Sequence, residues 1–434
     1  MEAGTYAGYA YAYPHKTSYR PLDPPVTFRT AWETENRDSL FLYVHIPFCE
    51  MRCGFCNLFT SIGPEQDFID ATMAAIERQS NQVADLVEPD QVTLAAFGGG
   101  TPSFLRTPEL VKMFDQLAST WSVDWADTPT SFEISPGTVD REKLAALKQV
   151  GISRISMGVQ SFVKHDLKAM ARPQKATEVE QACGWINELG FDTFNLDLIY
   201  GTANQTAGNW LHSLEQAVEH GPNELYLYPL YVRALTGLGR TGRQAGDHRR
   251  ELYRLARDYL TSVGFVQQSM RLFRRASTTQ PSSMDSVDYS CQEDAMVGLG
   301  PGARSYTSAL HYSSEYAVKR SGVDSIIDRF NRQQDFSTID YGIRLDIEEQ
   351  HRRYVIKSLL RSPGLDEAAF HRAFDLDPIE ALPQLVELEQ LGLAEHSQPN
   401  QLVLTPLGME YSDTIGPWLY SAAVNAQMDT FELV

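Results

Sequence analysis

Long apolar runs, cysteine and positive charge are all scarce in this chain of 434 residues. No stretch of about 18 consecutive apolar residues occurs, so we expect no membrane-spanning helix. Lys and Arg number 37 against 56 Asp and Glu, which gives a net charge of -19. That balance argues against nucleic acid as the main partner, because phosphate binding needs a basic surface.

Cysteine is also too rare for a disulfide-stabilised protein. The chain has five cysteines, an odd number, and three of them are clustered. Such a pattern does not form a disulfide framework. The first 13 residues have neither the basic start nor the apolar centre of a signal peptide. We therefore expect a cytoplasmic protein.

The cysteine cluster follows the apolar run Leu40–Ile46 and consists of Cys49, Cys53 and Cys56. Thiolates bind iron–sulfur clusters, and four irons need four ligands. Three cysteines leave one iron open, and the amino and carboxylate groups of S-adenosylmethionine (SAM) can fill that position. A zinc site with His45 as the fourth ligand is the alternative. The two remaining cysteines, Cys183 and Cys291, lie far away in the sequence.

Apolar strand segments alternate with amphipathic helical segments from Leu40 to about Phe273. The predicted strands are Phe41–Ile46, Val92–Phe97, Phe132–Ile134, Ile152–Val159, Phe194–Ile199 and Leu225–Leu230. The predicted helices are Asp67–Val83, Glu109–Leu117, Asp140–Lys148, Ala176–Leu189, Gly208–Glu219 and Arg249–Val263. Six such βα units predict a parallel sheet buried on both faces, in a doubly wound fold or an open barrel.

Polar and glycine residues follow one predicted strand after another, which favours the barrel. They include the cysteines, Gly98–Thr101, Glu133, Gln160, Asp197 and Tyr231. In a barrel all of these lie at the C-terminal mouth, whereas a doubly wound sheet binds ligands mainly at one switch point. The glycine turn allows a ligand to approach the backbone closely. Glu133 and Asp197 suit a ribose hydroxyl pair, with a helix cap or a buried ion pair as the alternative.

We divide the chain into four parts: an N-terminal arm (1–38), the barrel (39–275), a barrel extension with a substrate-side connection (276–344) and a C-terminal accessory domain (345–434). Three short helices are predicted in the last part, at Tyr354–Leu360, Leu365–Phe374 and Ile379–Leu391, followed by a small β-element at Leu402–Leu404, and together they resemble a winged helix. In the arm, His15, Lys16 or Arg20 either meets an anionic substrate or belongs to a segment that only covers the barrel. The basic stretch 233–250 is either a solvated loop or an anion-binding loop.

Several stretches together resemble the radical SAM superfamily, and within it the branch typified by oxygen-independent coproporphyrinogen III oxidase. The matching stretches are Tyr43–Cys49, Cys53–Cys56, Gly98–Pro102, Ser153–Phe162, Asp197–Gly201 and Gly298–Ala303. The resemblance covers roughly residues 40–420 and implies a partial (β/α)6 barrel with a small, mostly helical C-terminal domain. It implies a 4Fe–4S cluster held by the three cysteines and, with it, two SAM molecules.

The resemblance also implies roles for individual residues. Tyr43, Gly99 and Glu133 would touch the cluster-bound SAM. Phe55, Gly100, Thr101, Gln160, Arg172, Asp197 and Tyr231 would line a second SAM pocket. We expect Tyr43, Glu133 and Arg172 to take part in catalysis, and an arginine in such a place can hold a carboxylate bidentately.

Three substrate-side stretches depart from the decarboxylase pattern: Ala12–Arg20, Tyr226–Arg233 and Gln267–Arg275. The same branch includes class C radical SAM methyltransferases. Our main hypothesis is therefore a radical SAM enzyme that transfers a methyl or methylene group from the second SAM to a small or peptide-derived substrate. The alternatives are coproporphyrinogen III oxidation and a haem-binding chaperone. Each hypothesis implies a small-molecule substrate, and the arginines permit an anionic one. The enzymes also need a reductant such as flavodoxin or ferredoxin.

Overall fold

The computed structural model describes residues 6, 8–10, 12–233, 235–242, 245, 248–276 and 295–432. Cys291 and Arg243 lie outside these residues. In the part of the chain that is described, every helix is too short or too polar to cross a membrane.

Six parallel strands form the centre of the molecule. They are β2 (Leu40–Ile46), β5 (Val92–Gly99), β6 (Thr130–Ile134), β7 (Arg154–Gln160), β8 (Thr193–Tyr200) and β9 (Glu224–Pro229). They neighbour one another in this order, and each pairs in parallel with the next. All six coincide closely with the predicted strands. The fold is therefore the predicted α/β partial (β/α)6 barrel.

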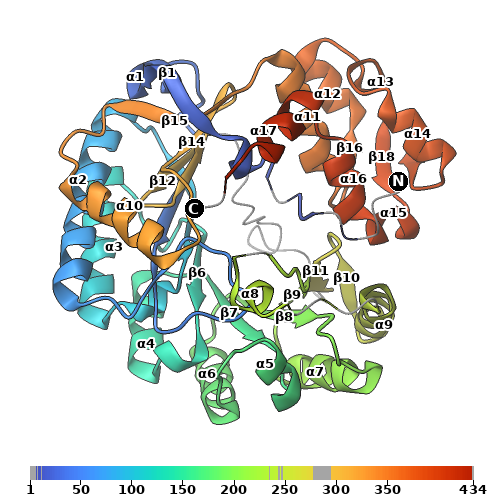
Figure 1. Cartoon of the computed structure of the whole chain (residues 1–434), viewed down its shortest axis with the longest axis horizontal. Helices are drawn as coiled ribbons and strands as arrows, with labels where there is room; N and C mark the ends of the chain where they lie inside the picture. Colours follow the sequence, from blue (N-terminus) through green and yellow to red (C-terminus); the bar gives the residue numbers. More distant parts are fainter. Residues whose placement is uncertain are drawn as a thin grey trace.

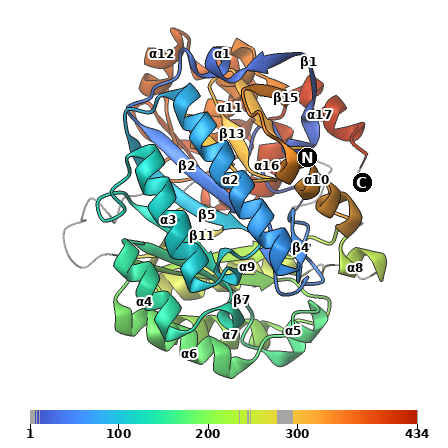
Figure 2. The same ribbon diagram turned by 90° about the vertical axis from the view of Figure 1, so that its left-hand side faces the viewer.

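A helix follows each of these strands and covers the outer face of the sheet, as Figure 1 and Figure 2 show. These helices are α2 (Gln66–Val87), α3 (Thr107–Trp121), α4 (Arg141–Val150), α6 (Ala176–Leu189), α7 (Ala207–Glu219) and α9 (Arg249–Ser262). In α2 the buried residues Ile69, Ile76 and Val83 recur every seven positions, so they share one face of the helix. Asp140 accepts a hydrogen bond from the Lys143 backbone and caps the start of α4.

The sheet extends beyond the predicted βα units on both sides. β12 (Met296–Leu299) pairs in parallel with β2, and the antiparallel strands β13 (Arg304–Tyr306), β14 (Leu310–Ser313), β15 (Thr338–Arg344) and β1 (Arg20–Thr27) follow outward. At the other edge, β11 (Leu272–Arg275) and β10 (Phe265–Gln267) pair antiparallel. Among the described residues this single sheet has thirteen strands. The N-terminal arm thus contributes one strand to this sheet.

The C-terminal region is mostly helical. Its helices are α11 (Ile347–Leu359), α12 (Glu367–Phe374), α13 (Pro378–Ala381), α14 (Gln384–Gln390), α15 (Pro406–Glu410), α16 (Ser412–Trp418) and α17 (Ala422–Asp429). A small sheet joins them, with strands β16 (Leu365–Asp366), β18 (Gln401–Leu404) and β17 (Ala394–Gln398). Tyr13 and Tyr19 of the arm are buried in the apolar core of this region. The predicted helix Ile379–Leu391 is two helices, because Pro383 interrupts it.

The remaining elements are short or connect the main ones. They are α1 (Phe28–Trp32), α5 (Lys164–Ala169), α8 (Gly237–Arg240), α10 (Arg320–Arg332), the strands β3 (Phe48–Cys49) and β4 (Ser61–Ile62), and the 3-10 turns η1 (Lys16–Ser18), η2 (Pro102–Phe104) and η3 (Pro136–Thr138).

Candidate active site

The three cysteines lie in the loop that leaves β2. Cys49 ends β3, which pairs with β4 and so closes the loop on itself. The Cys49 sulfur lies 3.3 Å from the hydroxyl of Thr101. Arg172 donates a hydrogen bond from Nη1 to the sulfur of Cys53 over 3.2 Å. Two predicted site residues from later parts of the barrel therefore contact two of the cysteines.

The electrostatic environment of the cysteines fits a metal cluster. Burial raises the pKa of Cys49 to about 12, and the charges of Cys56 and Cys53 raise it further. Burial also raises the pKa of Cys56, and Cys53 adds to the effect. The three thiols are thus close enough to oppose one another's ionisation. Iron ligation replaces the protons and relieves this repulsion, because thiolates are the ligand form.

His45, the fourth ligand in the zinc alternative, is engaged elsewhere. Its Nδ1 lies 3.1 Å from the Tyr43 hydroxyl, and its Nε2 lies 3.2 Å from the Phe59 carbonyl oxygen. Burial lowers the pKa of His45 to about 4, so the ring is neutral. Both ring nitrogens support the cysteine loop and the Tyr43 side chain. A role as metal ligand would require one of these two contacts to break, because an imidazole binds a metal through one ring nitrogen.

The glycine turn after β5 brings the backbone against the cysteine loop. Gly99 has φ = +115°, and a Cβ there would lie 2.7 Å from the His45 ring. A Cβ on Gly100 would lie 2.5 Å from the carbonyl oxygen of Phe48, the residue before Cys49. Glycine is required at both positions, because a side chain would displace the strand end that carries the first cysteine.

Glu133 and Asp197 face the inside of the barrel from two different strands. Glu133 accepts a hydrogen bond from the Gly99 backbone over 3.3 Å. Burial raises its pKa to about 7, and the charge of Asp197 adds to the shift. Burial likewise raises the pKa of Asp197 to about 6, although a hydrogen bond from Asn195 opposes this. Two carboxylates that share one interior with raised pKa values are typical of a functional site.

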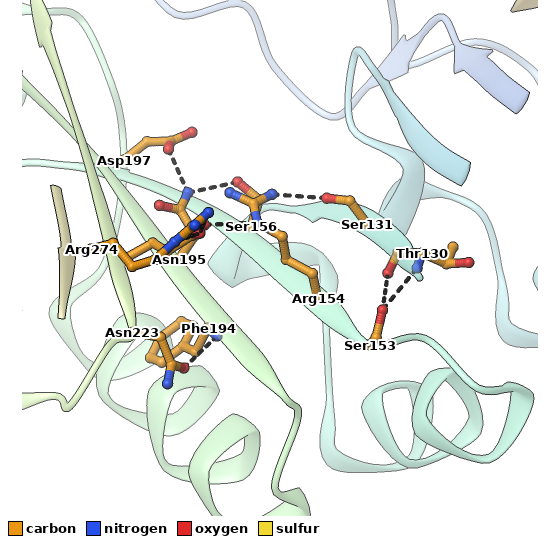
Figure 3. Close-up of polar contacts among 11 residues, drawn as sticks. Thr130, Ser131, Ser153, Arg154, Ser156, Phe194, Asn195, Asp197, Asn223 and Arg274 are labelled. Carbon is orange, nitrogen blue, oxygen red and sulfur yellow. Dashed lines mark hydrogen bonds and ion pairs between the residues drawn. The ribbon is translucent and has the colours of Figure 1, made fainter. Parts of the chain in front are cut away.

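An ion network joins strands β6, β7, β9 and β11, and Figure 3 shows part of it around Arg154. Arg154 donates from Nε to Glu224 over 2.9 Å and from Nη1 to Ser131 over 2.8 Å. Arg274 pairs with the other oxygen of Glu224 over 2.7 Å. Asn195 donates to Asp197 over 2.8 Å and so orients its carboxylate. Our sequence analysis assigned no role to Arg154, although it falls within the matching stretch Ser153–Phe162.

Gln160 and Arg172 meet beside Gly158. Arg172 donates to the Gly158 carbonyl oxygen, and its Nε donates to Gln174 over 3.0 Å. A Cβ on Gly158 would lie 2.7 Å from the Gln160 amide nitrogen. Gln160 has φ = +71°, an uncommon conformation for a residue other than glycine. The structure thus brings these two predicted residues together next to Cys53.

Phe55 and Tyr231 lie at the rim. Phe55 packs against a small apolar cluster that includes Met170 and Leu238. The Tyr231 hydroxyl donates to Asp413 of α16. Sequence reasoning did not find this link between the barrel and the C-terminal region, because neither residue belongs to a motif that predicts the other.

Comparisons with known proteins agree with this geometry. The Radical SAM superfamily model matches residues 43–217. The oxygen-independent coproporphyrinogen III oxidase of Synechocystis sp. is 27% identical over 386 residues, which cover 84% of this chain and 81% of the relative. The haem chaperone HemW of Bacillus subtilis is 26% identical over 364 residues, which cover 82% and 93%. The structure of coproporphyrinogen III oxidase (HemN) from Escherichia coli aligns with a TM-score of 0.78 and 21% identity over 98% of each chain.

The chain is therefore a radical SAM enzyme, with a 4Fe–4S cluster and SAM as its cofactors. Within the superfamily it resembles oxygen-independent coproporphyrinogen III oxidase and the haem chaperones.

Proposed function

We propose that this enzyme carries out an oxygen-independent oxidation of a propionate-bearing tetrapyrrole, of the kind named for its relative that oxidises coproporphyrinogen III. The proposal rests on the share of this chain that is similar to that relative. It spans 84% of this chain, far beyond the 43–217 region that the superfamily model matches, and so includes substrate-side segments. The same extent favours tetrapyrrole chemistry over the methyl transfer that was our main hypothesis from the sequence.

In this proposal Cys49, Cys53 and Cys56 hold the cluster. When bound, the cluster supplies the electron that cleaves SAM to a 5′-deoxyadenosyl radical. Gly99 offers its backbone to the SAM, and the Glu133 carboxylate accepts hydrogen bonds from the ribose hydroxyls. Tyr43 is held by His45 over 3.1 Å and closes the side of this pocket.

We also propose a second SAM pocket in the same barrel. Its walls are Phe55, Gly100, Thr101, Gln160, Arg172, Asp197 and Tyr231. Support comes from the contacts of Arg172, which lies between the Cys53 sulfur and the Gly158 carbonyl oxygen. A guanidinium at that position suits the carboxylate of an amino acid. Asp197, oriented by Asn195, suits a ribose.

The reductant that supplies the electron is proposed to dock near Cys53. A surface pocket of about 280 Å³ borders this cysteine and is lined by residues that include Arg52 and Arg240. Two arginines beside the cluster loop contrast with the net charge of -19 of the whole chain. They fit an acidic electron carrier such as flavodoxin or ferredoxin.

Anaerobic reconstitution followed by product analysis tests the function. The protein is supplied with SAM, a low-potential reductant and coproporphyrinogen III. An electron acceptor is added as well, because the hydrogen atom goes to the deoxyadenosyl radical and one further electron must leave with each carbon dioxide. We expect one deoxyadenosine and one carbon dioxide for each vinyl group formed on the porphyrinogen. Deoxyadenosine without carbon dioxide refutes the proposal, and S-adenosylhomocysteine in its place supports methyl transfer.

A haem chaperone is the second candidate, because a relative of that name is 26% identical and is covered over 93% of its length. Titration with haem separates it from the enzyme. A shifted Soret band at one equivalent, without carbon dioxide release from coproporphyrinogen III, favours the chaperone.

A further inference from the structure

Two residues that we assign to the second SAM pocket also contact cluster cysteines. Arg172 donates from Nη1 to the Cys53 sulfur over 3.2 Å. The Thr101 hydroxyl lies 3.3 Å from the Cys49 sulfur, and when that cysteine is a thiolate only the hydroxyl can donate. Two of the three cluster sulfurs therefore accept hydrogen bonds from side chains outside the cysteine loop.

The Arg172 guanidinium is fixed in place by its other contacts. Its Nη2 donates to the Gly158 carbonyl oxygen, and its Nε donates to Gln174 over 3.0 Å. A guanidinium carries five N–H groups, and the contacts with described residues use three of them. The two others can hold a SAM carboxylate while the contact with Cys53 persists.

The segment that carries Arg172 is also attached to the cysteine loop through its backbone. The Gly54 N–H donates to the Met170 carbonyl oxygen over 3.0 Å, and the Arg172 N–H donates to the Leu167 carbonyl oxygen over 2.9 Å. A Cβ on Gly54 would lie 2.8 Å from the Met170 oxygen, so glycine permits this close approach. Backbone packing therefore holds the guanidinium against Cys53.

A cationic donor beside a cluster thiolate acts on the redox state of the cluster. Reduction of a 4Fe–4S cluster adds one negative charge, and N–H groups that donate to the cysteine sulfurs stabilise the reduced form. Hydrogen bonds to the sulfurs are among the factors that set the potential of such a cluster. Cys53 is only 9% exposed, so water screens the charge of Arg172 little at this place.

We propose that Arg172 is a positioning residue that raises the reduction potential of the cluster through Cys53, and that Thr101 does so to a smaller extent through Cys49. Arg172 has the larger effect because charge-assisted hydrogen bonds are stronger than neutral ones. A higher potential makes the cluster easier for the reductant to reduce, and this reduction precedes SAM cleavage. The inference rests on the cluster and its cysteines, and it is independent of the proposed substrate.

A redox titration of the reconstituted holoenzyme without SAM, followed by electron paramagnetic resonance of the reduced cluster, tests the proposal. The variants are Arg172→Gln, Arg172→Lys and Thr101→Val. Lys168→Gln is the matched control, because Lys168 is an exposed cation of α5, four residues before Arg172, and among the described residues no contact joins it to a cysteine. The iron content of each variant is measured first.

The expected readout is the ratio of reduced to oxidised cluster at the solution potential that reduces half of the wild-type clusters. In Arg172→Gln this ratio should fall about tenfold, which for one electron is a shift of about 59 mV. In Thr101→Val it should fall about threefold, because a neutral donor is lost. Arg172→Lys should lie between the wild type and Arg172→Gln, since lysine keeps the charge and loses the fork of donors. Lys168→Gln should match the wild type.

An unchanged ratio in Arg172→Gln refutes the proposal, and so does a fall that Lys168→Gln reproduces, because the effect is then one of overall charge. If Arg172→Gln does not assemble a full cluster, Thr101→Val and Arg172→Lys decide. Lower ratios in both then support the proposal, and a wild-type ratio in either refutes it. Turnover of coproporphyrinogen III is measured separately, so a failure of the proposed function leaves the redox result standing.

Discussion

Removal of the Asp413 carboxylate tests how the C-terminal region is held on the barrel. Asp413 accepts two hydrogen bonds from the Arg271 guanidinium, at 2.6 and 2.7 Å. The side chains of Arg271 and Asp413 are only 5% and 2% exposed. Asp413 also accepts from the Tyr231 hydroxyl, and the Tyr9 ring lies 3.6 Å above the guanidinium. Asp413→Ala leaves a buried cation without its counter-charge, so we expect a loss of about 3–5 kcal/mol of unfolding free energy.

Urea unfolding of the cluster-free protein, followed by circular dichroism, measures this loss. With a slope of roughly 3 kcal/mol per molar urea, the midpoint falls by about 1–1.7 M. Glu188→Ala is the matched control, because Glu188 forms an equally short pair with Arg141 at 2.6 Å but both side chains are more than half exposed. That exposed pair contributes about 0–1 kcal/mol.

A double variant distinguishes the free energy lost with the ion pair from the cost of leaving one buried charge unpaired. Arg271→Met with Asp413→Leu replaces both partners by apolar groups of similar size, and we expect it to recover most of the stability. An Asp413→Ala midpoint that matches Glu188→Ala contradicts the reasoning. So does a double variant that is as unstable as Asp413→Ala, since the cost then does not come from an unpaired charge.

Three further predictions concern the site. Cys53→Ala should bind little iron and produce no deoxyadenosine, whereas full iron content in this variant would remove Cys53 from the cluster ligands. Gly100→Ala places a methyl 2.5 Å from the Phe48 carbonyl oxygen, so iron content should fall, while Gly184→Ala, which meets nothing within 4 Å, should keep it. The pKa of Glu133 near 7 predicts that its carboxyl is mostly protonated at pH 6 and ionised at pH 8. The ratio of SAM affinities between wild type and Glu133→Gln should therefore rise over that range in equilibrium binding, and a constant ratio would exclude Glu133 from SAM recognition.

The strands and helices of the barrel could be predicted because each has a recognisable pattern within its own segment of the sequence. Each parallel strand is buried on both faces, so it reads as a short apolar run, and each covering helix shows a one-sided pattern. Strands β2, β5 and β8 therefore begin and end within two residues of the prediction. The strands β12 to β15 were missed because they are short and are stabilised by neighbours distant in the sequence, such as β2 beside β12.

The arginine-rich stretch 233–250 shows why charge alone did not predict function. Both Arg249 and Arg250 are engaged in packing: Arg249 donates to the Leu230 carbonyl oxygen over 3.0 Å, and Arg250 pairs with the buried Glu410. Arg249 and Arg250 therefore attach this stretch to the barrel and to the C-terminal region. Neither a solvated loop nor an anion-binding loop would use its arginines in this way. Arg233 instead lies over the Tyr231 ring, 5.0 Å from its centre. The sequence pattern is the same for all of them, and only tertiary contacts distinguish their roles.

Radical generation and substrate choice are carried by different parts of this chain. The region matched by the superfamily model ends at residue 217, and it contains every cysteine of the cluster as well as Glu133, Arg172 and Asp197. The three substrate-side stretches that depart from the decarboxylase pattern, Ala12–Arg20, Tyr226–Arg233 and Gln267–Arg275, lie outside it. The same is true of Asp413, which links the C-terminal region to Arg271 and Tyr231. Substitutions in these outer segments should therefore change which substrate is oxidised, or how strongly the C-terminal region is held on the barrel. Binding of the cluster and of its SAM should stay unchanged.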